Sequence, residues 1–83
     1  MKAEIDQTVK QYILNEFLVG EDPNELTDKT PLITGGILDS IKTLKLVAFL
    51  KERYAIRVDA HEMDVKYLNT VADITKFVLF KKG

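Results

Sequence analysis

The sequence predicts an all-α protein: a four-helix bundle with three main helices, a short third helix and a long first loop. Three observations support this prediction. Apolar residues recur at helical spacing in three separate segments of the chain. Residues that typically cap helices precede two of those segments. No segment shows the strict apolar–polar alternation that is typical of a half-buried strand.

The first helix is predicted over residues 3–19. Its apolar positions repeat every four residues, which places them on one helical face. They are Ile5, Val9, Ile13 and Phe17. Gly20 follows directly and is a stop signal, so we expect the helix to end at Val19.

Residues 20–38 form a long connection. Pro23, Pro31 and the pair Gly35–Gly36 disfavour helix. The segment nevertheless carries too many apolar residues for a disordered linker: Leu26, Leu32, Ile33, Ile37 and Leu38. We therefore expect a loop pinned onto the core, with a short turn of helix inside it. Gly35–Gly36 lacks the Gly-Lys-Ser/Thr ending of a phosphate-binding loop and predicts a tight turn instead.

The second main helix is predicted from Asp39–Ser40 to about Tyr54, with Asp39 or Ser40 as its amino-terminal cap. One side of its helical wheel supplies core residues: Thr43, Leu46, Val47, Leu50 and Tyr54. The roughly opposite side carries a second apolar set: Ile41, Leu44 and Ala48. We expect this second set to be exposed, because the first already fills the core face.

The remaining chain predicts a weak helical stretch over residues 61–67 and a last helix from Thr70. Thr70 and Asp73 have the spacing of a capping box, with Asp in place of the preferred Glu or Gln. The last helix has an apolar face of Val71, Ile74, Phe77 and Val78. Lys81 and Lys82 are favourable near its carboxyl-terminal end.

The length of 83 residues predicts one domain spanning residues 1–83. The chain has no cysteine and one histidine, which excludes disulfides, thiolate metal sites, a cysteine nucleophile and a multi-histidine site. No apolar run is long enough to span a bilayer, and the first ten residues lack the apolar core of a secretion signal. We expect a soluble, cytoplasmic protein that is monomeric.

The net charge of −1 hides an asymmetry. Residues 1–41 carry three lysines and eight acidic residues, whereas residues 42–83 carry nine basic and five acidic residues. A nucleic-acid-binding protein is expected to have a stronger basic excess and more arginine, so we expect no nucleic-acid partner and no membrane partner. The acidic cluster over residues 21–28 lacks the alternating ligands and the glycine of a calcium loop, and predicts a solvated loop without metal.

The strongest functional signal is the segment Gly-Ile-Leu-Asp-Ser-Ile at residues 36–41, in which Ser40 opens an amphipathic helix. Unpaired N–H groups and the helix dipole favour an anion at a helix start, so a phosphate ester on Ser40 would be stabilised there. A simple role as a helix cap would equally explain the presence of a serine at position 40. A serine hydrolase built from Ser40, His61 and an acid is the least favoured alternative, because so short a chain leaves little room for a substrate pocket.

The stretch Gly-Ile-Leu-Asp-Ser-Ile-Lys-Thr-Leu-Lys-Leu-Val-Ala-Phe-Leu at residues 36–50 resembles the region around the modified serine of acyl and peptidyl carrier proteins. The core motif of that family is Asp-Ser-Leu followed by an apolar-rich helix. The resemblance continues through Tyr54, Ile56 and Val58 to Asn69-Thr70-Val71, which opens the last helix. It therefore covers nearly the whole chain in length, helix order and loop placement.

The resemblance implies that Ser40 receives a 4′-phosphopantetheine arm from coenzyme A, attached by a phosphopantetheinyl transferase that uses magnesium. Asp39 would be the acid of the motif, and Ile41 stands where leucine is usual. The thiol of the arm would carry acyl or aminoacyl groups as thioesters. The chain itself would hold substrates for partner enzymes and have no catalytic residue of its own.

The second helix is then expected to dock partner enzymes through its exposed apolar strip, in the manner of a helix lying in a groove. The expected partner-binding residues are Leu38, Ile41, Lys42, Leu44, Lys45, Ala48 and Met63. Met63 belongs to a short apolar stretch with Val65, Tyr67 and Leu68, which is expected either to contact the cargo or arm, or to close the bundle.

The charge of the second helix departs from the family pattern. Carriers of fatty-acid synthesis usually have an acidic second helix, whereas residues 41–54 carry a net charge of +3. The basic patches of the enzymes that dock such acidic helices would repel a basic helix, because like charges weaken association. We therefore expect a dedicated carrier, loaded by its own acyl- or aminoacyl-activating ligase and used by downstream synthase enzymes. The alternatives are a housekeeping fatty-acid carrier and an unmodified helical adaptor that uses the same strip.

Overall fold

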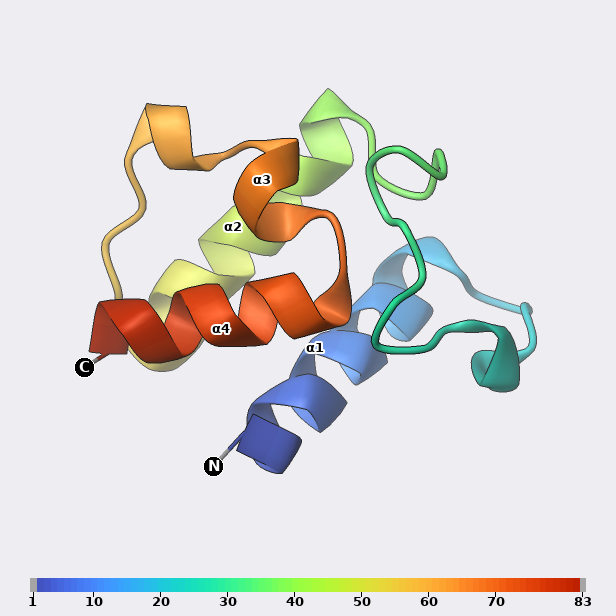
Figure 1. The fold of residues 1–83 in the computed structure, drawn as a ribbon. Coiled ribbons are helices and arrows are strands. Elements are labelled where there is room, and N and C mark those ends of the chain that lie inside the picture. Colours follow the sequence, from blue (N-terminus) through green and yellow to red (C-terminus); the bar gives the residue numbers. More distant parts are fainter. Residues whose placement is uncertain (1, 83) are drawn as a thin grey trace.

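A computed structural model describes residues 2–82 of the chain, which fold into a helical bundle (Figure 1). Four α-helices are present in this range: α1 (Lys2–Phe17), α2 (Ser40–Tyr54), α3 (Val65–Leu68) and α4 (Val71–Lys82). Two short 3-10 turns accompany them, η1 (Pro23–Glu25) in the first loop and η2 (Ala60–Glu62) before α3. Residues 2–82 contain no strand. The predicted all-α class and the predicted order of helices are confirmed.

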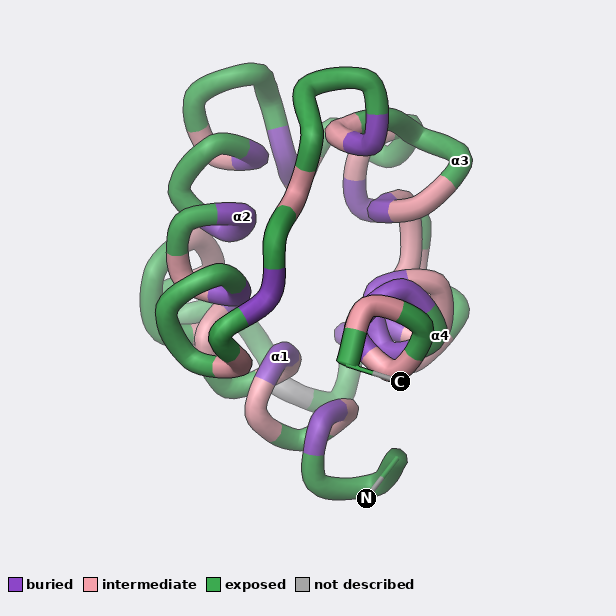
Figure 2. Tube along the Cα trace, turned by 90° about the vertical axis from the view of Figure 1, so that its left-hand side faces the viewer, coloured by how far each residue is buried: buried purple, intermediate pink, exposed green. Residues whose placement is uncertain are grey.

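One core lies between the helices. Figure 2 shows the buried positions of α1, α2 and α4 turned toward the interior. Helix α4 makes its most extensive contacts with α1 and α3. The radius of gyration is 11.6 Å, close to the ~12 Å expected for a compact folded chain of this length. The buried side of α2 is the predicted one: Thr43, Leu46, Val47 and Leu50, with Tyr54 half-buried.

Helix α1 ends two residues before the expected Val19. The Leu18 amide donates to the Ile13 carbonyl at 3.2 Å, and the Glu21 amide donates to the Leu18 carbonyl at 3.0 Å. The second bond closes a turn that includes Gly20, whose φ is +87°. Because this turn takes up residues 18–21, Val19 lies outside the helix and is exposed.

The long first loop is pinned to the core, as predicted. Leu26, Leu32 and Leu38 are buried, and Ile33 and Ile37 pack against the core from half-buried positions. The expected short turn of helix within the loop is η1. The loop therefore belongs to the folded body of the protein, and it delivers the chain to the start of α2 along a defined path.

The weak helical stretch expected over residues 61–67 consists of two separate pieces, η2 and α3. They are divided because Asp64 starts a new helix: its Oδ1 accepts the Val65 amide at 2.7 Å. Helix α4 begins after Thr70, whose Oγ1 accepts the Asp73 amide at 3.0 Å, so Thr70 acts as the predicted cap.

Within residues 2–82, no helix combines the length and the apolar character that crossing a bilayer would require.

Candidate functional site

The start of α2 combines a capped helix end with an exposed hydroxyl. Asp39 is the N-cap: its Oδ1 accepts the Lys42 amide at 2.8 Å, and its backbone carbonyl accepts the Thr43 amide at 2.9 Å. Ser40 is the first residue of the helix and is exposed. Since Asp39 supplies the capping oxygen, the Ser40 hydroxyl is not used to close the helix end. Ser40 is also the only serine in the chain.

Buried neighbours on both sides hold Ser40 at the surface. Leu38, two residues earlier, is 3% exposed, and Thr43, three residues later, is also buried. Ser40 and Ile41, which lie between them, are both exposed. The backbone at Ser40 is therefore anchored while its side chain faces solvent, which is the arrangement that a surface modification requires.

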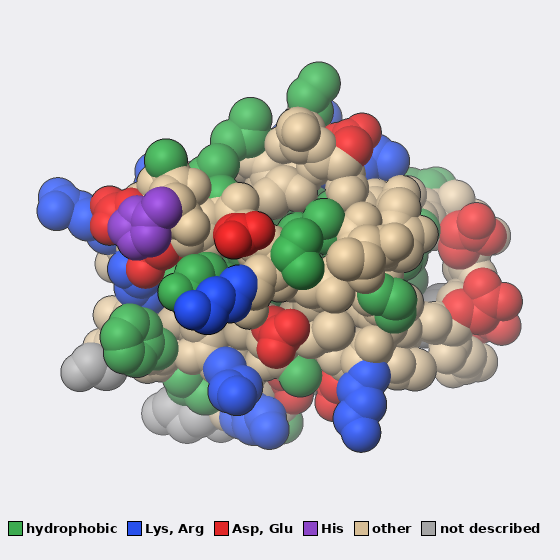
Figure 3. Space-filling view, turned by 45° about the horizontal axis from the view of Figure 1, so that its top comes forward, with side chains coloured by type: hydrophobic (Ala, Val, Ile, Leu, Met, Phe, Trp, Pro, Cys, Tyr) green, Lys and Arg blue, Asp and Glu red, His purple; other side chains and the backbone are tan. Residues whose placement is uncertain are grey.

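An exposed apolar strip follows Ser40 along α2. Ile41 is 67% exposed, Leu44 is 52% exposed and Ala48 is exposed. The expectation that these three residues face solvent is confirmed. Figure 3 shows exposed hydrophobic side chains at several places along the upper edge of the molecule. Two large apolar side chains and an alanine on one helix face are more than the scattered single apolar residues of an ordinary surface.

The other expected partner-binding residues differ in their accessibility. Lys45 is exposed and Lys42 is half-buried. Leu38 was expected at the docking surface, and this is wrong, because its side chain lies in the core and its amide donates to the Leu32 carbonyl at 2.8 Å. Met63 is half-buried against the core, as is Tyr67, and Leu68 is fully buried. All three residues therefore lie in the core or pack against it.

Asn69 contacts the loop that precedes α2. The sequence analysis did not predict this contact. Its side-chain Oδ1 accepts the amides of Ile33 and Thr34, each at 3.0 Å. Its backbone carbonyl accepts the Leu32 amide at 2.6 Å. In the sequence, Asn69 was notable only as part of the segment that opens the last helix. Asn69 lies 36 positions after Ile33 and 35 positions after Thr34, and no local sequence pattern indicates a contact over such a separation.

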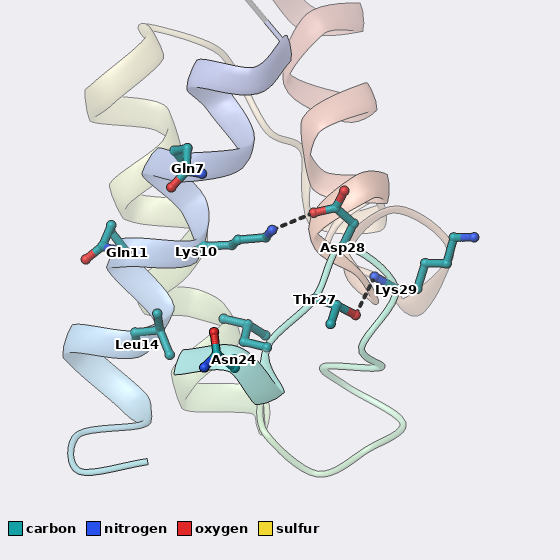
Figure 4. A pocket seen from close by; sticks show the side chains of 9 residues that line it. Gln7, Lys10, Gln11, Leu14, Asn24, Thr27, Asp28 and Lys29 are labelled. Carbon is teal, nitrogen blue, oxygen red and sulfur yellow. Dashed lines mark hydrogen bonds and ion pairs between the residues drawn. The ribbon is translucent and has the colours of Figure 1, made fainter. Parts of the chain in front are cut away.

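In the predicted solvated acidic loop, Asp28 contacts helix α1. A groove of about 580 Å³ lies between α1 and residues 24–29, and Figure 4 shows Lys10 and Asp28 pointing toward each other across it. Lys10 Nζ and Asp28 Oδ1 are 2.8 Å apart. This contact lowers the pKa of the Asp28 carboxyl below its ordinary value. The pair ties the first loop to α1.

Glu62 is the other carboxylate with a perturbed pKa. Its Oε1 lies 2.7 Å from Lys81 Nζ and accepts the Asp59 amide at 3.0 Å. Both contacts favour the charged form, so the pKa of Glu62 is lowered, with the Lys81 contact contributing most. Across residues 2–82, no set of three or more His, Asp or Glu side chains is arranged to hold a metal ion.

His61, the only histidine, lies in η2 and is exposed. In Figure 1, η2 and the start of α2 lie on opposite sides of α3. The two elements that carry the residues of the hydrolase alternative therefore lie apart in this view.

No known protein-family model matches this sequence.

Proposed function

We propose that this protein is a carrier of acyl or aminoacyl groups, held as thioesters on a 4′-phosphopantetheine arm attached to Ser40. The observation that carries the proposal is the exposed, anchored Ser40 at the first position of α2, with the neighbouring Asp39 providing the cap. A four-helix bundle with a long first loop accords with the carrier-protein resemblance of residues 36–50.

The residues around Ser40 fit a phosphodiester. Asp39 Oδ1 accepts the Lys42 amide, and the other N–H groups that the first turn leaves without partners within the helix favour an anion. Lys42 and Lys45 add positive charge within the next five residues. In the modification, the Ser40 Oγ–phosphorus bond would form as the bond from that phosphorus to adenosine 3′,5′-bisphosphate breaks. The hydroxyl proton would leave to the transferase. When attached, the arm supplies the thiol that the chain lacks.

The chain's own contribution is presentation and recognition. The apolar strip of Ile41, Leu44 and Ala48 begins directly beside Ser40 and would enter an apolar groove on a partner enzyme. The basic charge of α2 selects partners with acidic surroundings. We therefore assign the chain to a dedicated cytoplasmic pathway with its own activating ligase, rather than to housekeeping fatty-acid synthesis.

Co-expression with a broad-specificity phosphopantetheinyl transferase, followed by intact mass measurement, tests the proposal. The wild-type chain should gain the mass of one phosphopantetheinyl group, and Ser40→Ala should gain none. Helical content should be unchanged in Ser40→Ala, because Asp39 retains the capping bond. Thr8→Ala on α1 is the matched control, since it removes a hydroxyl elsewhere and should be modified like the wild type.

The alternatives give different results in the same experiment. An unchanged mass with several transferases would reject the carrier and favour an adaptor that binds through the apolar strip. Hydrolysis of an activated ester that depends on both Ser40 and His61 would favour the hydrolase.

A further inference from the structure

The turn that precedes α2 is held from a distant part of the chain. Asn69 is the carboxyl-terminal cap of α3 and lies between α3 and α4. Three consecutive amides of the first loop donate to its oxygens: Leu32 to the backbone carbonyl, and Ile33 and Thr34 to Oδ1. The Asn69 Nδ2 group donates to Thr34 Oγ1 at 3.2 Å. One residue thus satisfies backbone donors that the loop itself leaves without partners.

The held turn leads directly to Ser40. The Leu38 amide donates to the Leu32 carbonyl at 2.8 Å, which closes residues 32–38 into a loop. Leu32 and Leu38, at its two ends, are both buried. The Gly36 amide donates to the Ile33 carbonyl at 3.2 Å within the loop. Asp39 then caps α2. Hydrogen bonds and the buried side chains of Leu32 and Leu38 therefore connect Asn69 to Asp39, the residue before Ser40.

We propose that Asn69 is a positioning residue for Ser40: by holding residues 32–34, it keeps the 32–38 loop in the one conformation that a modifying enzyme recognises. This inference rests on the proposed carrier function. Without the Asn69 side chain, the Ile33 and Thr34 amides lose their acceptor, and the loop populates other conformations. A partner that binds one conformation then binds with an apparent affinity reduced by the fraction of molecules that adopt it.

This mechanism predicts a specific kinetic pattern. Transfer of the arm should show a higher KM for the carrier with kcat unchanged, because molecules that bind are in the correct conformation. For Asn69→Ala we expect KM to rise about tenfold, the factor that corresponds to about 1.4 kcal/mol. A merely structural role would leave both constants unchanged at temperatures where the variant remains folded.

Three further variants complete the kinetic test. Asn69→Asp keeps an oxygen that can accept both amides and should restore a KM close to that of the wild type. Asn69→Gln carries its oxygen one methylene further and should give an intermediate KM, and it serves if Asn69→Ala does not fold. Thr75→Val removes the hydrogen bond between Thr75 and Asp6 that joins α4 to α1 and is the stability control. Its KM should equal that of the wild type.

Amide hydrogen exchange of the unmodified protein tests the same inference without a transferase. The Ile33 and Thr34 amides should exchange about tenfold faster in Asn69→Ala, while amides in α1 keep their wild-type rates. Relaxation of the Ser40 backbone amide should also report greater motion. Exchange that is equally slow in both proteins would overturn the inference.

The two proposals can fail separately. Faster exchange with an unchanged KM would show that Asn69 holds the loop without positioning Ser40, and would overturn the inference alone. If the wild-type chain accepts no arm, the carrier function fails. Recognition by a modifying enzyme fails with it, and the exchange rates and the motion of the Ser40 amide then decide whether Asn69 holds the 32–38 loop.

Discussion

Asp39 and Ser40 are neighbours in the sequence with different structural roles. The Asp39 carboxylate accepts the Lys42 amide and stabilises the start of α2. Removing such a cap costs about 1 kcal/mol, whereas a change at the first helical position costs only the difference in helix propensity. Chemistry at Ser40 can therefore proceed without loosening the helix that presents it.

The glycines of the first loop are required for two different reasons. A Cβ on Gly35 would overlap the Pro31 carbonyl oxygen, so the backbone must shift to accept it. Gly36 has a φ of +84° and open space around it. A side chain there would contact no other atom, and its only cost would be the strain of a positive φ. We expect Gly36→Ala to cost about 1 kcal/mol and Gly35→Ala about 2–3 kcal/mol. Urea unfolding followed by circular dichroism measures both values.

Gly20 is the matched control for conformational strain. Its φ is +87°, and a Cβ at this position would meet no other atom within 4 Å, as at Gly36. Gly20→Ala and Gly36→Ala should therefore cost similar amounts, and both less than Gly35→Ala. Equal costs at all three positions would show that the close approach of Gly35 to Pro31 is not a tight constraint.

At the scale of elements, the short pieces between α2 and α4 are held by side chains. Elements η2 and α3 have three and four residues, far fewer than the ~12–15 that an isolated helix needs in water. Asp64 caps α3, and Glu62 joins η2 to the end of α4 through Lys81. The conformation of this segment therefore depends on a few carboxylates.

These contacts predict that the protein loses stability in acid. The pKa values of Glu62 and Asp28 are lowered by their lysine partners, so each contributes stability that is fully present above its ordinary pKa. That stability begins to be lost as the pH falls to the ordinary values, 4.5 for Glu62 and 3.8 for Asp28, and is gone below the lowered values of the folded state. Urea unfolding at a series of pH values measures the loss.

Lys81→Met should flatten this pH dependence, because the pKa of Glu62 returns toward its ordinary value. Lys76→Met is the control: Lys76 is an exposed lysine of the same helix, and within residues 2–82 the structure shows no ion pair for it. Its pH dependence should match that of the wild type. If the free energy of unfolding depended on pH equally in both variants, the role given to the Glu62–Lys81 pair would be contradicted.

At the scale of the whole molecule, charge is distributed unevenly. The first loop carries most of the acidic excess, and α2 and the elements after it carry the basic excess. Such a distribution acts on encounter rates and on the choice of partner more than on the stability of the fold. The proposed ligase of this carrier should therefore present acidic side chains around the groove that receives α2.

Reversal of charge on α2 tests that expectation. Lys42→Glu combined with Lys45→Glu should lower kcat/KM for loading by the cognate ligase about tenfold or more at low salt, because it opposes electrostatic steering. The difference should shrink as salt is added. Initial loading rates over a range of carrier and salt concentrations measure both effects.

Lys66→Glu combined with Lys76→Glu makes the same change of charge on α3 and α4. This pair should leave the loading rate close to that of the wild type. An equal loss in both double variants would indicate that net charge alone matters, and unchanged rates in the first would show that the basic side of α2 is not the docking surface.

Much of the architecture was predictable from local patterns. The four-residue spacing of Ile5, Val9 and Ile13 identified the buried face of α1, and the double apolar pattern of α2 separated its core face from the exposed strip. Helix ends were less predictable. The end of α1 depends on a turn closed by Leu18 and Glu21, and the division of η2 from α3 depends on the Asp64 cap.

Local residue patterns were enough to specify which segments are helical, where α2 begins and that Ser40 opens it, because these features depend on residues within a few helical turns. The burial of Leu38 in the core and the contact of Asn69 with the 32–38 loop became evident only from the packed helices. Both depend on which distant segments contact each other in the folded chain, and the spacing of residues along the sequence does not indicate those contacts.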